Sequence, residues 1–237
     1  MSKRKVVWIA LPAYTGVVHI ATMRSLMADI MALGARGDAV RLYDEIGSAL
    51  LADTRSQMVA DFLAGDGTHL VFVDWDVCWD RRAGGMDRLV DHGVDCVAGM
   101  YPMRKEPIQF NLRAEQEDGK GLYVNRQNGL IEVWGVSAGF LCCSRKMLQQ
   151  MTDHYRDQLS FDHPKVKGKA AVGLFDPYVV PGTRRKLGED YAFCQRWRDM
   201  GGQVWVDAQI SMGHIGSKTY VGEFGRFVAD NKEETAA

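Results

Sequence analysis

Apolar and polar residues alternate along the first hundred positions in blocks that predict strands and helices in turn. The predicted strands lie at 6–11, 40–43, 69–73 and 95–100. Between them, apolar residues recur every three or four positions over 20–33 and 51–63, and a glycine follows each stretch, which predicts amphipathic helices. Strands and helices in this alternation favour a parallel, doubly wound α/β sheet.

The pattern loosens after residue 105. A helix is predicted to begin near Arg145, and another spans Glu189–Met200 and precedes a strand at 204–206. Residues 160–187 contain three prolines and a group of basic side chains, which predicts a loop. Because no repeat or linker composition interrupts the chain, we expect a single domain over 1–237 with a short tail at 226–237.

The charge balance excludes one simple class of function. The 237 residues carry 29 basic and 30 acidic side chains, a formal net charge of −1, so the chain is not a uniformly basic protein that coats nucleic acid. No stretch approaches the 18 apolar residues of a membrane span. The five cysteines lack CxxC spacing and predict reduced core thiols of a cytoplasmic protein, with a zinc site or redox pair as the alternative.

Two carboxylates directly follow the strand at 69–73. Asp74 and Asp76 are two residues apart, so on an extended chain their side chains point the same way. Ligand sites of open α/β sheets form at this carboxyl end of the strands, and a divalent cation would relieve the repulsion between the carboxylates. The alternative is a pair of solvated aspartates that opens a loop.

Two further segments hold candidate chemistry. Glu189 and Asp190 open a predicted helix, where acidic residues complement the helix dipole or, alternatively, supply a general base. His214 lies between Gly213 and Gly216, where an imidazole reaches a metal or a phosphate, or else packs at the surface.

Together and in this order, four segments resemble the GT-A superfamily of nucleotide-sugar glycosyltransferases. They are HLVFVDWD at 69–76, VSAGFL at 136–141, GEDYAFC at 188–194 and GHIG at 213–216. Within that superfamily the chain resembles the compact bacterial and phage-encoded members. The resemblance implies an α/β, Rossmann-like fold with a mostly parallel central sheet and helices on both faces. It also implies a nucleotide-sugar-binding half at 1–105 and an acceptor-binding half at 106–225.

The resemblance also implies roles for single residues. A nucleotide sugar, expected to be UDP-linked, would contact Pro12, Ala13, Tyr14, Arg55, Asp74, Trp75, Ala138 and Gly139. Arg55 would lie near the nucleotide base. Mn²⁺ or Mg²⁺ would be held by Asp74, Asp76 and His214, and Asp190, or less readily Glu189, would act as the catalytic base toward an acceptor hydroxyl.

The acceptor is suggested by charge. Between residues 163 and 187 the sequence has one acidic residue, Asp176. The same segment has six lysines and arginines: Lys165, Lys167, Lys169, Arg184, Arg185 and Lys186. We expect Arg184, Arg185 and Lys186 to bind an anionic acceptor, and phage-encoded proteins of this type suggest hydroxymethylated pyrimidines in DNA, modified in the host cytoplasm. Alternatively, the basic segment is a solvated loop and the acceptor is a cell-surface glycan, a lipid or a protein. The alternatives to a glycosyltransferase are a sugar nucleotidyltransferase and a non-catalytic nucleotide-sugar-binding protein.

Overall fold

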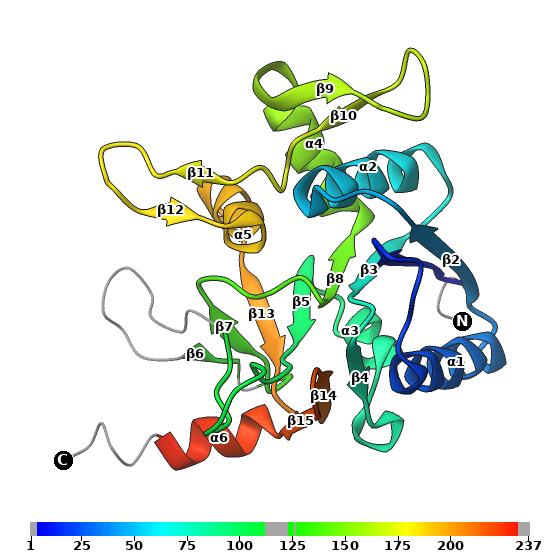
Figure 1. Ribbon diagram of the computed structural model, residues 1–237, viewed down its shortest axis with the longest axis vertical. Helices are drawn as coiled ribbons and strands as arrows, with labels where there is room; N and C mark the ends of the chain where they lie inside the picture. Colours follow the sequence, from blue (N-terminus) through cyan, green and yellow to red (C-terminus); the bar gives the residue numbers. More distant parts are fainter. Residues whose placement is uncertain (1–3, 112–122, 126, 232–237) are drawn as a thin grey trace.

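The computed structural model of the protein describes residues 4–111, 123–125 and 127–231. Its main sheet has eight strands in the order β2–β1–β3–β8–β5–β13–β7–β6 (Figure 1). Their bounds are β2 Ala39–Glu45, β1 Val6–Pro12, β3 His69–Val73, β8 Phe140–Ser144, β5 Cys96–Gly99, β13 Val204–Asp207, β7 Ile131–Val133 and β6 Tyr123–Val124. β8 and β7 run opposite to their neighbours, and the other strands share one direction.

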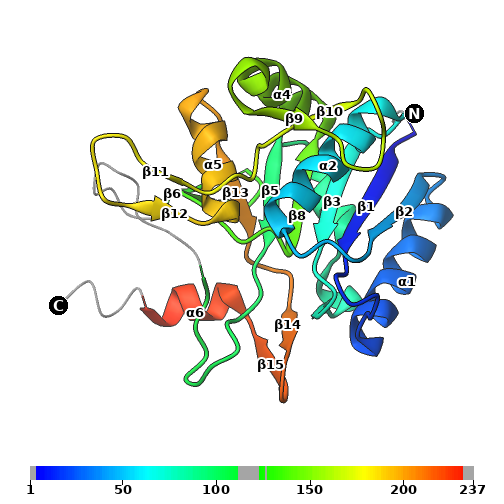
Figure 2. The same ribbon diagram turned by 45° about the horizontal axis from the view of Figure 1, so that its top comes forward.

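Helices cover both faces of this sheet. One face carries α2 (Leu51–Ala64), α4 (Arg145–Leu159) and α5 (Glu189–Asp199), and the other carries α1 (Ile20–Ala35) and α3 (Met86–Asp91) (Figure 2). Alternate residues of β3 enter two separate hydrophobic clusters, Leu70 and Phe72 with the first set of helices and Val71 and Val73 with the second. This alternation is the two-residue period of a strand buried on both faces. The predicted fold class, α/β with a mostly parallel central sheet, is confirmed.

The antiparallel strand β8 is the main departure from the predicted sheet. It lies between β3 and β5, so that Cys142 pairs with Val71 on one side and with Val97 on the other. Phe140 to Cys143 are all buried, and a continuous apolar run carries no signal of strand direction. The sequence therefore predicted the neighbouring parallel strands but not the strand that separates them.

The segment at 160–187 is not simply a loop. It contains two short hairpins, β9 (Ser160–Asp162) with β10 (Ala170–Val172) and β11 (Tyr178–Val179) with β12 (Lys186–Leu187). Strands of two or three residues are too short for an alternating pattern to show. The first hairpin lies beside α2 and α4 (Figures 1 and 2).

The chain ends on a small sheet and a helix. The sheet joins β4 (Val77–Trp79), β14 (Met212–Ile215) and β15 (Thr219–Gly222), and α6 follows at Phe224–Asn231. Residues 226–231 of the expected tail are therefore helical, because Phe224 and Phe227 each pack 5.2 Å from the ring of Phe110; residues 232–237 lie outside the described residues. Within the described ranges, no helix has the length and apolar character needed to cross a membrane.

Candidate active site

A cavity of about 260 Å³ opens at the carboxyl ends of β1 and β3. This is the edge of an open α/β sheet at which ligands bind. Its lining residues are Pro12, Ala13, Tyr14, Glu45, Ser48, Ala49, Leu51, Thr54, Asp74, Trp75, Asp76, Tyr101, Arg104 and His214. The cavity thus brings together three segments that the sequence analysis had singled out separately: the residues after β1, the pair of aspartates after β3, and His214.

Asp76 and His214 face one another in this cavity. His214 Nε2 lies 3.8 Å from Asp76 Oδ1, and Asp76 is almost fully buried. The other ring nitrogen, Nδ1, is 2.9 Å from the Pro102 carbonyl oxygen; since that oxygen only accepts, Nδ1 carries the proton and Nε2 keeps its lone pair. Burial, assisted by the Arg104 charge, lowers the pKa of His214, so the ring is neutral at pH 7. A neutral imidazole beside a carboxylate is a suitable pair of ligands for Mn²⁺ or Mg²⁺.

Asp74 lines the same cavity but is held by other partners. Its Oδ1 accepts a hydrogen bond of 2.9 Å from Arg55 Nη2, and its backbone N–H donates to the Gly139 carbonyl at 3.0 Å. Consequently, no three His, Cys, Asp or Glu side chains gather around a metal position in the part of the chain that the structure describes. Of the three residues expected to hold a cation, the structure brings together Asp76 and His214.

Arg104 is a site residue that the sequence analysis did not assign to the cavity. Its guanidinium contacts the Asp76 carboxylate, and its own side chain is 40% exposed. Residue 104 follows β5 and residue 76 follows β3, so no local spacing connects them. The contact balances the charge of Asp76 in this structure.

Glu189 and Asp190 are the first two residues of α5, and both carboxylates lie near Arg55. Asp190 Oδ1 accepts a hydrogen bond of 2.6 Å from Arg55 Nη1, and Glu189 Oε1 lies 3.8 Å from the same nitrogen. Burial raises the pKa of Asp190 to about 6, while Arg55 and a backbone hydrogen bond from Ala138 oppose the rise. A carboxylate that titrates near neutrality and is held by hydrogen bonds has the properties of a general base.

Gly139 allows a close approach next to these carboxylates. A Cβ at this position would lie 2.6 Å from Asp74 Oδ2 and would also meet the hydroxyl of Tyr101. Its N–H donates to that hydroxyl at 3.2 Å. Ala138 is buried beside it, so the predicted small pair lies between Asp74 and Asp190.

The six basic residues expected to form one patch are divided between the two hairpins. Lys165 and Lys169, on the turn between β9 and β10, pair with Glu45 and Asp61. Arg184 and Lys186 are exposed on the other hairpin, while the guanidinium of neighbouring Arg185 covers the Trp134 ring at 5.1 Å. Trp134 in turn stacks on Tyr191, at 5.8 Å between ring centroids. The predicted acceptor-binding residues therefore lie on the side of the site where Asp190 stands.

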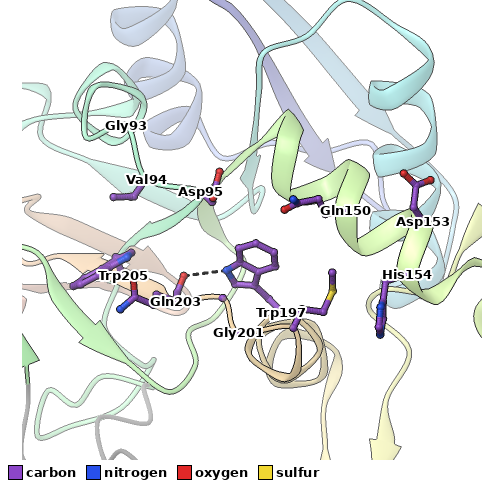
Figure 3. Close-up of a pocket in the computed structure, with 12 residues that line it drawn as sticks. Gly93, Val94, Asp95, Gln150, Asp153, His154, Trp197, Gly201, Gln203 and Trp205 are labelled. Carbon is purple, nitrogen blue, oxygen red and sulfur yellow. Dashed lines mark hydrogen bonds between the residues drawn. The ribbon is translucent and has the colours of Figure 1, made fainter.

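A larger cavity, of about 650 Å³, lies at the opposite edge of the sheet (Figure 3). It is formed where β5 and β13 begin, between α4 and the turn after α5. Trp197 donates its indole N–H to the Gln203 carbonyl there at 3.1 Å, and both Trp197 and Trp205 are only 6% exposed. No residue that the sequence analysis assigned to the site lines this cavity.

Comparison with known proteins identifies related folds and no family. No protein-family model matches the sequence, and no curated protein matches it. A solved structure of A197 from STIV aligns with a TM-score of 0.54 at 15% identity, covering 94% of this chain and 91% of that chain. At this identity the likeness shows a shared fold.

Two other solved structures align less well. GalNAc-T7 with UDP, GalNAc and Mn2+ gives a TM-score of 0.49 at 11% identity, covering 94% of this chain and 45% of that chain. The 4-diphosphocytidyl-2C-methyl-D-erythritolsynthase from Anaerococcus prevotii DSM 20548 gives 0.35 at 9% identity, covering 68% and 80% respectively.

Proposed function

We propose that this protein is a metal-dependent glycosyltransferase of the GT-A type that moves a sugar from a nucleotide sugar, a UDP-sugar, to an acceptor hydroxyl. One observation carries the proposal. The segments that resemble GT-A motifs, spread over residues 69–216, meet at one edge of the sheet: Asp76 with His214, and Asp74 with Asp190 through Arg55. Solvated aspartates or an isolated helix cap would not require this convergence.

In the proposed reaction, Asp76 and His214 would hold the divalent cation beside the diphosphate of the donor. A cation bound there supplies Lewis-acid stabilisation of the charge on the departing nucleoside diphosphate. Arg104 contacts Asp76 in this structure and would compete with the cation for this carboxylate. The Pro102 carbonyl accepts the Nδ1 proton of His214, which leaves the Nε2 lone pair for a cation, and burial favours the neutral ring.

The remaining residues bind and orient the two substrates. Pro12, Ala13 and Tyr14 border the cavity on the side where we place the nucleoside, and Trp75 lies at its mouth, 38% exposed. The absence of a side chain at Gly139 lets Asp74 and Tyr101 lie against the backbone beside the donor site. Asp190 accepts the proton of the acceptor hydroxyl as that oxygen attacks the anomeric carbon, a role that contributes roughly 10²–10⁴-fold.

For the acceptor we propose DNA that carries a hydroxymethylated pyrimidine. Arg184 and Lys186 are exposed on the hairpin next to Asp190, where they are placed to contact phosphates. The pairing of Lys165 and Lys169 with carboxylates removes two of the six charges from this argument. An uncharged glycan, lipid or protein acceptor would make the reaction independent of these two cations.

The donor site is tested by calorimetry of UDP binding with and without Mn²⁺. We expect Asp76→Asn to abolish the metal-dependent part of UDP binding. Asp80→Asn is the matched control, because Asp80 lies after the same segment, pairs with Arg82 and does not line the cavity. Metal-dependent binding that survives in Asp76→Asn at the wild-type affinity would refute the donor site.

The acceptor is tested by mass spectrometry. DNA that contains 5-hydroxymethylcytosine is incubated with the protein, Mn²⁺ and a panel of nucleotide sugars, and the expected product is a base heavier by one sugar. Unmodified DNA of the same sequence is the control. If only the nucleotide sugar is hydrolysed, the transferase donor site stands and the DNA acceptor is wrong.

A further inference from the structure

One buried guanidinium connects the carboxylate at the end of β3 with the carboxylate that opens α5. Arg55, in α2, is 1% exposed. Its Nη2 donates to Asp74 Oδ1 at 2.9 Å, and its Nη1 donates to Asp190 Oδ1 at 2.6 Å. The two acceptors are 19 and 135 residues away along the chain. Arg55 is therefore the direct polar link between the donor-side and acceptor-side elements of the site.

The surroundings of Arg55 leave its side chain little freedom. The guanidinium carbon lies 5.9 Å from the centre of the Phe175 ring, and that ring stacks on Phe193 at 4.3 Å with 8° between the planes. Its Nε is buried and has no hydrogen-bond partner among the described residues. The carboxylate contacts of the two Nη groups thus fix the orientation of the fork.

We propose that Arg55 is a positioning residue that holds Asp74 and Asp190 in one ion-paired unit, so that the donor-binding and acceptor-activating carboxylates are oriented by the same group. The assignment of those two roles rests on the proposed function. An arginine suits this task because its planar fork presents two separate N–H donors, whereas a lysine ammonium is a point charge on a flexible stem. Sequence resemblance placed Arg55 near the nucleotide base; the contacts of Arg55 point to the carboxylates.

The ion-paired unit has a measurable consequence for stability. Removing the shared cation of a buried ion-paired unit leaves its carboxylates as uncompensated charges, which is strongly destabilising, whereas Asp190→Asn leaves Arg55 paired with Asp74. In Arg55→Gln, Asp74 and Asp190 lose their shared cation and Glu189 loses its nearest one. A second substitution, Asp190→Asn, then removes one of the uncompensated charges and restores stability.

The first arm of the test compares the effect of Asp190→Asn in two backgrounds at pH 7.5 by thermal unfolding. We expect the substitution to raise the unfolding midpoint by at least about 5 °C more in Arg55→Gln than in the wild type, from the cost of an uncompensated buried charge and the thermal response of a chain of this size. In the Arg55→Lys background, the rise in unfolding midpoint caused by Asp190→Asn is expected to lie between its values in the wild type and in Arg55→Gln. Equal effects in both backgrounds would overturn the ion-paired unit.

Arg196 provides a matched control for a buried arginine. It is 6% exposed, donates to the Leu174 carbonyl at 2.9 Å, and forms no ion pair within the ranges that the structure describes. Arg196→Gln should destabilise the protein without changing the effect of Asp190→Asn. An equal rescue in this background would show that the rescue is a general response to lost stability, and would overturn the inference.

The second arm measures positioning by calorimetry with UDP and Mn²⁺. The double variant Arg55→Gln/Asp190→Asn is compared with Asp190→Asn alone, because Asp190→Asn restores stability. We expect the Kd for UDP of the double variant to be at least about tenfold higher. This factor corresponds to the loss of one charge-assisted hydrogen bond to Asp74. Equal Kd values would overturn the positioning role. If no variant binds UDP, the wild type included, the proposed function fails; a failed stability cycle alongside normal UDP binding overturns the inference on Arg55 alone.

Discussion

The burial of Asp190 should make this candidate catalytic group a cost to stability at neutral pH. Burial raises its pKa from 3.8 to about 6, against the opposing charge of Arg55. For a carboxyl group with a raised pKa in the folded state, the stabilising contribution is fully present below pH 4, where both states are protonated. It is lost as the pH rises through about 6, because the folded state must then hold the charge.

The size of the effect follows from the shift. A rise of about two pKa units corresponds to about 3 kcal/mol of difference between the folded and unfolded states. The Asp190 side chain is 18% exposed, so this figure is an upper limit. Replacement of Asp190 by asparagine removes the ionisation while keeping the shape of the side chain.

We therefore expect Asp190→Asn to be more stable than the wild type at pH 8, by up to about 3 kcal/mol, and to match it near pH 4. The assay is urea unfolding at five values between pH 4 and 8, with the free energy of unfolding extrapolated to zero urea. Groups that titrate equally in both proteins cancel in the difference. Glu189→Gln is the control, since the Glu189 side chain is 35% exposed and should change stability by no more than about 0.5 kcal/mol.

A variant that is less stable than the wild type at pH 8 would refute this reasoning. It would mean that the hydrogen bond from Arg55 outweighs the cost of burying the Asp190 charge. A stabilisation that is equal at pH 4 and pH 8 would refute it as well, because the benefit would then come from packing and not from ionisation.

Three more predictions concern the cavity and the hairpin next to it. Arg104→Gln should tighten Mn²⁺ binding in the absence of nucleotide, because the cation no longer competes with a guanidinium for Asp76. Arg104→Lys keeps a positive charge and should not tighten Mn²⁺ binding. Electron paramagnetic resonance titration measures the Mn²⁺ affinity of both variants. Gly139→Ala should weaken UDP binding by roughly tenfold through the clash with Asp74, whereas Gly34→Ala, with open space around it, should leave calorimetry unchanged. Finally, Lys186→Ala should reduce the dependence of DNA binding on salt concentration by about one counterion, as measured by fluorescence anisotropy at several salt concentrations.

Much of the first half of the fold could be predicted from the sequence. The strand predicted at 69–73 is β3 with the same bounds, and the helices predicted over 20–33 and 51–63 are α1 and α2 with one or two residues added. These elements have long, regular apolar periods and clear glycine stops. The position of β8 could not be predicted, because strand order and direction are decided by which surfaces pack together in three dimensions.

The candidate site was predictable to a similar degree. Asp76 and His214 could be expected near one another because each follows a strand of the predicted sheet and each lies in a segment with a family resemblance. The partners of Arg55 and Arg104 could not, since an ion pair between residues 55 and 190 leaves no periodic signal in either helix. The nucleotide and acceptor contacts of the other residues stay predictions.

Two arginines balance the carboxylates of the candidate site, and they differ in burial. Arg55 is buried and donates one hydrogen bond to each of two carboxylates, so displacing it from Asp74 would leave a charged group inside the protein short of a partner. Arg104 is 40% exposed, so its charge would be rehydrated if it were displaced from Asp76. Under the proposed function, we therefore expect a divalent cation to compete more readily for Asp76 than for Asp74. The same difference in burial leads us to propose Asp74 for orientation of the site and Asp76 for the metal, although spacing alone makes the two aspartates equivalent.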